Sequence, residues 1–384
     1  MDAFLGNSGI ALRWVLEKAS PSASTPFLDN MVEHANVYQF SEEEAGQLGD
    51  IYRVTFQATP HSDALLPSLI IKVPSVIQAQ KLLGAPELSD AFLRRIHNSE
   101  CIFYEHFAQD SDLPLAKCFF QQQLLPDQKG IVVLEDLSSS GANLPIWQGL
   151  SLAQCQNFTL SLARFHAKCL KSAEDWKSKV LWREAGDYAL LDAIFEQTQA
   201  ALTTVFPDIF TEEDMAKLKK IFHADKTLEA IYAYRTAGIP PVLVHGDPWS
   251  HNLLFEKIVN DPEAVGSKLV GIIDWQESHP GTLTEDFARF LVSSCSVKFR
   301  RQHWEQILSE YHSELRRQLG NDCLPQLTLD LVKSLYLKLL PYSTAYFAIE
   351  TGMLMASPRF QGTENEGKLM EVVNRLKAAM EDAF

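Results

Sequence analysis

Three side chains that can bind a cation or a proton through oxygen follow one another closely along the sequence. Asp247 and Asn252 lie in HGDPWSHN, and Asp274 ends the apolar run GIID. Phosphoryl transfer needs a carboxylate that orients the attacking hydroxyl and oxygen ligands that hold Mg²⁺ against the phosphates. The spacing H-x-D-x-x-x-x-N equals a catalytic-loop pattern in which Asp is the base and Asn binds the metal. One such residue alone would more often cap a turn, but the ordered set predicts a phosphoryl-transfer site.

The motifs HGDPWSHN, IIDWQ and GTLTEDFARFL resemble those of the choline-kinase and aminoglycoside-phosphotransferase superfamily. The resemblance covers about residues 40–345 and is nearest to the ecdysteroid-kinase-like, or CHK kinase-like, branch, particularly its nematode members. Trp249 is typical of that branch. The resemblance implies that Asp247 is the catalytic base, that Asn252 and Asp274 bind Mg²⁺, and that Asp286 braces the catalytic loop.

The same resemblance implies a strand lysine that binds the nucleotide phosphates and a helix glutamate that holds this lysine. Lys72, the one charged residue in LIIKV, fits the first role, although a strand lysine can also simply extend its amine to water. HNSECIFY resembles the branch's H-x-x-E-x-x-F-Y pattern, which favours Glu100 over Glu105 as the partner. We therefore predict that Lys72 and Glu100 take part in nucleotide binding.

Two further segments could contact the nucleotide through their main chain. LEDL, residues 134–137, looks like a hinge in which Glu135 and Leu137 meet the adenine edge, although a charged hairpin exit is the ordinary alternative. AGQLGDIYRV offers Gly46 and Gly49 as a phosphate-covering loop. This segment departs from the G-x-G-x-x-G of protein kinases and resembles the shorter loops of small-molecule kinases.

Hydrophobic patterning predicts the elements that would position these residues. Alternating or apolar runs indicate strands within residues 46–74 and a hairpin within 118–137, while residues 89–108 have helical spacing. Most of the chain after residue 151 is helical, interrupted by strands within 241–275, and Thr282 with Glu285 could form a capping box. The predicted fold class is α+β: a bilobal protein-kinase-like fold, with an N-terminal antiparallel sheet lobe, a mainly helical C-terminal lobe and ATP in the cleft. The predicted parts are a helical extension (1–40), the N-terminal lobe (41–138) and the C-terminal lobe with the catalytic loop (139–384).

Composition limits the classes of partner. A net charge of −15 disfavours nucleic acid and anionic membranes, whose binders concentrate Lys and Arg. The six cysteines form no C-x-x-C pair, which indicates a reducing compartment. The sequence shows neither a signal-peptide pattern nor an apolar run long enough for a membrane span. We expect a cytoplasmic enzyme that binds ATP, Mg²⁺ and a small-molecule hydroxyl substrate, with no nucleic-acid, membrane or obligate protein partner.

The acceptor is indicated more weakly. The branch suggests a steroid-like alcohol, and a set of aromatic residues near the motifs could line an apolar pocket, cage a choline-like ammonium or simply form helix core. These residues are Trp249, Trp275, Tyr342, Tyr346 and Phe347.

Other functions remain open at this point. One is a pseudokinase that binds nucleotide without turnover, which the joint presence of Lys72, Asp247, Asn252 and Asp274 opposes. Another is a choline- or ethanolamine-type kinase. A third is a metal-dependent hydrolase that would use His245, His251 and His279, although their spacing matches no known ligand pattern. A protein kinase is disfavoured because no A-P-E element follows Asp274.

Overall fold

The chain forms two compact units. The computed structural model describes residues 4–41, 48–57, 68–83, 86–172, 175–357 and 360–384. The first unit comprises Met1–Glu105 and Ala116–Ser139, and the second comprises His106–Leu115 and Ser140–Phe384.

The first unit is built on a five-stranded antiparallel sheet with the strand order β1-β2-β3-β5-β4. Successive side chains of a strand point to opposite faces. Leu69, Ile71 and Val73 therefore share one buried face of β3, and Lys72 points to the other. The strands are β1 (Ala35–Gln39), β2 (Gly49–Phe56), β3 (Ser68–Pro74), β4 (Cys118–Gln122) and β5 (Ile131–Glu135).

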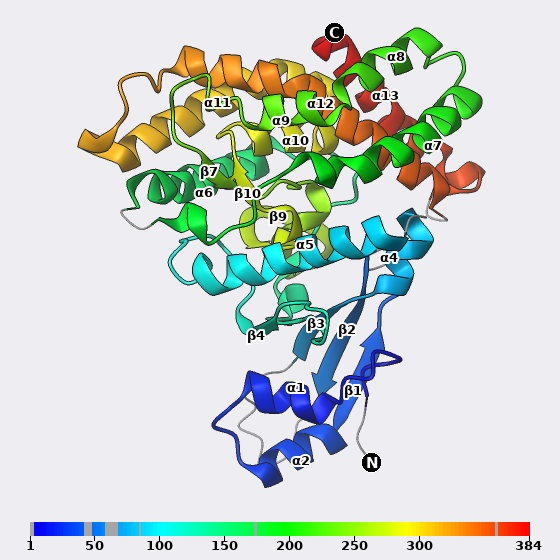
Figure 1. Ribbon diagram of the computed structural model, residues 1–384, viewed down its shortest axis with the longest axis vertical. Coiled ribbons are helices and arrows are strands. Elements are labelled where there is room, and N and C mark those ends of the chain that lie inside the picture. Colours follow the sequence, from blue (N-terminus) through cyan, green and yellow to red (C-terminus); the bar gives the residue numbers. More distant parts are fainter. Residues whose placement is uncertain (1–3, 42–47, 58–67, 84–85, 173–174, 358–359) are drawn as a thin grey trace. The chain divides into compact units, whose positions relative to one another are not determined.

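Helices cover both faces of this sheet. α1 (Leu12–Ala19) and α2 (Thr25–Glu33) supply Leu12, Val15 and Leu28 to the core on the Leu69 side, and Figure 1 shows the two helices together in blue. On the Lys72 side lies α5 (Pro86–His106), preceded by α4 (Val76–Leu83). Residues 1–40, predicted as a helical extension, thus contribute α1, α2 and also the edge strand β1.

The second unit is mainly helical. Its strands form two small sheets that carry the predicted catalytic loop: β7 pairs with β10, and β8 lies between β6 and β9. These strands are β6 (Gly141–Ala142), β7 (Val242–Val244), β8 (Leu253–Ile258), β9 (Asp261–Ile272) and β10 (His279–Gly281). The helices are α6 (Leu152–Lys171), α7 (Ala189–Val205), α8 (Glu212–Ile221), α9 (Ala224–Ile231), α10 (Glu285–Ser294), α11 (Val297–Leu319), α12 (Leu329–Ala356) and α13 (Glu366–Ala383).

This architecture confirms the predicted α+β, protein-kinase-like fold class: an antiparallel sheet unit carries a Lys–Glu pair, and a mainly helical unit carries the catalytic loop. The predicted capping box is wrong. Thr284, not Thr282, is the N-cap of α10, and the Thr282 hydroxyl instead donates to the Ile231 carbonyl at 2.7 Å.

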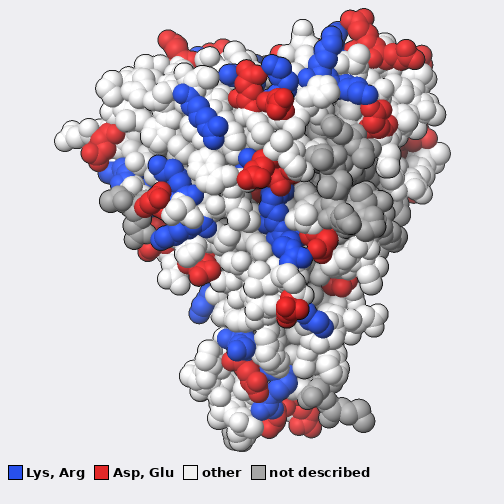
Figure 2. All heavy atoms as spheres, in the orientation of Figure 1, with Lys and Arg blue, Asp and Glu red and all other residues white. Residues whose placement is uncertain are grey.

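Charged side chains of both signs lie on the surface. On the face drawn in Figure 2, Lys and Arg side chains lie among Asp and Glu side chains. Within the described residues, no helix is both long enough and apolar enough to cross a membrane. The six cysteines are all unbridged.

Candidate active site

The catalytic loop begins where β7 ends, and a buried carboxylate fixes its backbone. Asp286, in the first turn of α10, accepts hydrogen bonds from His245 N at 3.0 Å and Gly246 N at 2.9 Å. Gly246 has φ 85°, and a Cβ added there would lie 2.4 Å from the Glu277 carbonyl oxygen. Only glycine fits this position without displacing the main chain. The bracing role predicted for Asp286 is confirmed.

The hairpin of β8 and β9 brings the two predicted metal ligands to the same end. Leu253 pairs with Ile272, and Ile273 N donates to the Asn252 carbonyl at 3.0 Å. Asn252 and Asp274 therefore flank the start of one strand and the end of its partner. Asp274 has φ 66° and ψ 62°, the left-handed conformation that non-glycine residues adopt at a cost. Such strain is concentrated at functional sites, where the surrounding structure enforces it.

Asn252 also links the metal-ligand candidates to the candidate base. Its Nδ2 atom donates to the Asp247 carbonyl at 2.9 Å and lies 3.4 Å from Asp247 Oδ2. Because the amide nitrogen is turned toward Asp247, the amide oxygen is the atom that could bind a cation. The pKa of Asp247 is raised, chiefly by burial, and the nearby charges of Asp274 and Glu277 add to this effect. Asp247, Asn252 and Asp274 are thus neighbours in space.

One residue of this site was missed by the sequence analysis. Arg289 is 2% exposed, and its Nη2 atom lies 2.7 Å from Asp247 Oδ1 and 2.5 Å from Glu350 Oε1. Burial disfavours the charged guanidinium, but the two carboxylates outweigh that cost and hold the pKa of Arg289 above its usual range. The signal was in the motif EDFARFL, since a residue three positions after Asp286 shares its helix face.

The three histidines near the carboxylates make structural contacts. His245 Nε2 lies 2.9 Å from the Ile273 carbonyl, and its Nδ1 accepts a hydrogen bond from Asp247 N at 3.2 Å. His279 Nδ1 lies 2.8 Å from the Glu277 carbonyl, and His251 stacks on Trp249. These contacts hold the His245 ring within the core of the loop. Among the described residues, no three His, Cys, Asp or Glu side chains cluster closely enough to hold a metal.

In the first unit, Lys72 and Glu100 form a direct ion pair. Lys72 Nζ lies 2.7 Å from Glu100 Oε2, and the Glu100 side chain is 2% exposed. Glu105, the rejected candidate on the same helix, is exposed and contacts Gln121. The predicted pairing of strand lysine and helix glutamate is therefore found with the expected partner.

The remaining nucleotide candidates are only partly described. Glu135 ends β5, where its N–H donates to the Lys117 carbonyl at 2.8 Å, and Leu137 begins a short 3-10 helix, Leu137–Ser139. The Glu135 N–H is therefore engaged within the sheet. Gly46 lies outside the described residues, and Gly49 is the first residue of β2.

The aromatic residues near the motifs divide into core and partly exposed side chains. Trp275 and Phe347 are fully buried, and Tyr342 is nearly so. Of the alternatives left open by the sequence, helix core is the one that holds for Trp275 and Phe347, because both are packed core residues. Trp249 and Tyr346 are partly exposed and remain candidates.

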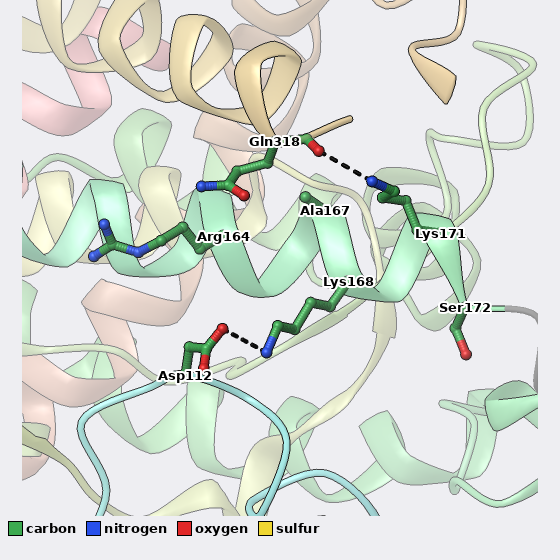
Figure 3. Close-up of a pocket in the computed structure, with 7 residues that line it drawn as sticks. All are labelled: Asp112, Arg164, Ala167, Lys168, Lys171, Ser172 and Gln318. Carbon is green, nitrogen blue, oxygen red and sulfur yellow. Dashed lines mark hydrogen bonds and ion pairs between the residues drawn. The ribbon is translucent and has the colours of Figure 1, made fainter. Parts of the chain in front are cut away.

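A separate hollow of about 450 Å³ lies on the second unit and contains none of the predicted site residues. Figure 3 shows that Lys168 reaches Asp112 across it, and that Lys171 bonds the Gln318 carbonyl. Four of its lining residues belong to α6, and three of these are long cationic side chains. The lining consists of Asp112, Arg164, Ala167, Lys168, Lys171, Ser172 and Gln318.

Comparison with known proteins gives a family and several distant likenesses. Residues 73–384 match the DUF1679 family, described as "Uncharacterized oxidoreductase dhs-27". The Caenorhabditis elegans protein of that name is 22% identical over 81% of this chain, which spans 38% of its length. The kinase-like protein D1044.1 of the same organism is 23% identical over 68% of this chain and 69% of its own.

Solved structures with a similar chain fold include aminoglycoside phosphotransferases. A GDP complex of an aminoglycoside 2'-phosphotransferase-IIIa mutant is 15% identical, with a TM-score of 0.48 over 96% of this chain and 94% of its own. A putative aminoglycoside phosphotransferase from Ralstonia eutropha is 14% identical, with a TM-score of 0.48 over 97% of each chain.

Proposed function

The chain belongs to the DUF1679 family, and we propose that it is a small-molecule kinase that transfers the γ-phosphoryl group of ATP to a substrate hydroxyl. The matches to nematode proteins confirm the predicted membership of the CHK kinase-like and aminoglycoside-phosphotransferase superfamily. One observation carries the proposal: Asp247, Asn252 and Asp274 are brought together by a braced loop and a hairpin.

In this proposal Asp247 orients the acceptor hydroxyl and receives its proton. The main chain around Asp247 is fixed by Asp286 and Asn252. The carboxylate therefore needs little rearrangement when the acceptor binds. Lys72, held by Glu100, neutralises and positions the nucleotide phosphates. Because the Glu135 N–H is bound to Lys117, the proposed contacts for the adenine edge are the Glu135 carbonyl and main-chain groups of Leu137.

The donor atoms fit Mg²⁺. The Asn252 amide oxygen and the Asp274 carboxylate are hard oxygen ligands, and Mg²⁺ is commonly bound by one or two carboxylates together with substrate phosphates. When bound, Mg²⁺ would neutralise charge on the transferring phosphoryl group. Asp274, strained into the left-handed region, would present its carboxylate from the end of β9.

For the acceptor we propose an uncharged or weakly polar alcohol, with a steroid-like alcohol as the first candidate. Support comes from the branch that the motifs resemble and from the partly exposed rings of Trp249 and Tyr346. The buried Trp275 and Phe347 no longer contribute to this argument.

A phosphate-transfer screen tests both levels of the proposal. Purified protein with Mg²⁺ and γ-labelled ATP is offered hydroxysteroids, choline, ethanolamine and aminoglycosides, with Asp247→Asn as the matched control. We expect label on at least one alcohol, and none with the variant. Transfer to choline or an aminoglycoside but to no apolar alcohol would refute the proposed class of acceptor. The assignment as a small-molecule kinase would then still hold. Nucleotide binding without any transfer would favour the pseudokinase.

A further inference from the structure

Arg289 joins two acidic side chains that lie far apart in the sequence. Its Nη2 atom contacts Oδ1 of Asp247, in the catalytic loop, and Oε1 of Glu350, in α12. Since one nitrogen serves both oxygens, the two carboxylates must lie close to each other. All three residues belong to the second unit.

Arg289 is more deeply buried than its two acidic partners. Arg289 is 2% exposed, whereas the side chains of Asp247 and Glu350 are each 20% exposed. The guanidinium thus lies beneath two carboxylates that reach the surface of the unit. A buried arginine without counter-charges would be strongly destabilising, and the two carboxylates offset that cost for Arg289.

Helix α12 fixes Arg289 from a second direction. The guanidinium carbon lies 4.6 Å from the centre of the Tyr346 ring, a cation–π distance, and Tyr346 precedes Glu350 by one helical turn. Tyr342, one turn earlier, packs edge-on against Tyr346. A single face of α12 therefore determines where the guanidinium can be.

The two oxygens of Asp247 have different surroundings. Oδ1 is bound by Arg289 at 2.7 Å, while Oδ2 receives a long contact of 3.4 Å from Asn252. The contact at Oδ1 restricts rotation of the carboxylate, which narrows the positions that Oδ2 can occupy. A base must be within hydrogen-bond reach of the proton that it takes, so this restriction affects whether an acceptor hydroxyl is well placed.

We propose that Arg289 and Glu350 are positioning residues for phosphoryl transfer: Glu350 fixes Arg289, and Arg289 orients the Asp247 carboxylate toward the acceptor hydroxyl. This inference rests on the proposed kinase function. It extends the site from the catalytic loop to α12.

The test uses Glu350→Gln, which keeps the shape and an oxygen for Arg289 but removes the charge. We expect Mg-ATP affinity within twofold of wild type and a fall in kcat of about 10- to 100-fold, the size associated with a displaced catalytic group. The reaction is measured with the acceptor found in the screen and, in parallel, as slow Mg-ATP hydrolysis. Arg289→Lys should retain more activity than Arg289→Ala, because it keeps the charge.

The chain offers a matched control. Arg375 is also buried, its Nε lies 3.0 Å from Glu371 Oε1, and its Nη1 and Nη2 atoms donate to the carbonyls of Ile146, Ser293 and Trp147. Glu371→Gln removes the same kind of ion pair, and we expect kcat within twofold of wild type. Adding Glu350→Gln to Asp247→Asn should lower the rate no further, because both act through one carboxylate.

The possible results are distinguishable. If Glu350→Gln lowers the melting temperature but leaves kcat per folded molecule within twofold of wild type, the pair is purely structural and the inference is overturned. An additive loss in the double variant would overturn it too. If the wild-type protein itself shows neither transfer nor Mg-ATP hydrolysis, the proposed function fails, and the inference fails with it.

Discussion

Lys72 Nζ lies 2.7 Å from Glu100 Oε2, which ties the third strand of the sheet to helix α5. Because Glu100 is buried and Lys72 is its partner, the lysine amine is held near one position instead of moving freely in water. Such a fixed ammonium can act on nucleotide phosphates with little further ordering.

We expect Lys72→Met to weaken Mg-ATP binding by about 10- to 100-fold, since a hydrogen bond to a charged group contributes about 1.5–3 kcal/mol. Titration calorimetry measures this directly. Glu105→Gln, on the exposed side of the same helix, is the control and should bind like wild type. Unchanged affinity in Lys72→Met would remove this lysine from the proposed nucleotide site.

Asp247→Asn should separate chemistry from binding. The carboxylate acts on the acceptor hydroxyl, so its loss should leave the affinity for Mg-ATP unchanged and reduce turnover by about 10²- to 10⁴-fold, the range for a general base. Rates are compared at saturating nucleotide. Turnover at the wild-type rate would show that Asp247 is not the base.

Much of this site could be predicted because its residues are close in the sequence or lie in regular elements. HGDPWSHN and IIDW placed Asp247, Asn252 and Asp274 on a loop and a hairpin, and the pairing of Leu253 with Ile272 has that geometry. LIIKV was predicted to be a strand with a single lysine, and in β3 this lysine lies on the face where Glu100 meets it.

The remainder depends on tertiary contacts that leave no local pattern. Arg289 and Glu350 meet Asp247 from two helices, and nothing in LYLKLLPYSTAYFAIE marks one glutamate as the partner of a buried arginine. Trp275 follows Asp274 directly, yet it turns into the core, where its Nε1 donates to the Ile272 carbonyl at 3.2 Å. The direction of a side chain in a loop is set by packing, which spacing alone does not specify.

Stabilisation by ATP should require Mg²⁺. Without the metal, the phosphates would meet the carboxylates of Asp247 and Asp274 unscreened, so binding and the linked rise in melting temperature should be small. The measurement is a thermal shift with ATP, in Mg²⁺ and in EDTA. Asp274→Ala should lose the Mg²⁺-dependent part while the protein stays folded, which its melting temperature without ligand reports. Equal stabilisation in EDTA would contradict the assigned metal ligands.

Two buried histidines should make the protein sensitive to acid. Burial lowers the pKa of His97 to about 4 and that of His166 to about 3, both below the ordinary value of 6.5. Below pH 6.5 these two imidazole rings therefore bind protons in the unfolded chain but not in the folded protein. The free energy of unfolding falls as the pH drops from 6.5 toward 4. Each histidine can contribute up to about 3 kcal/mol to this loss, since one pKa unit corresponds to about 1.36 kcal/mol.

Urea unfolding of wild type and His166→Gln, at several pH values between 7.5 and 4.5, isolates one of these contributions. His166 Nδ1 lies 2.8 Å from the Tyr311 hydroxyl, so the variant should be less stable than wild type at pH 7.5. Because glutamine does not titrate, that difference should shrink steadily as the pH falls below 6.5. His223→Gln, at an exposed position, controls for the loss of a histidine and should keep the wild-type pH dependence. A difference between wild type and His166→Gln that stays constant across this pH range would show that His166 is not held neutral by burial.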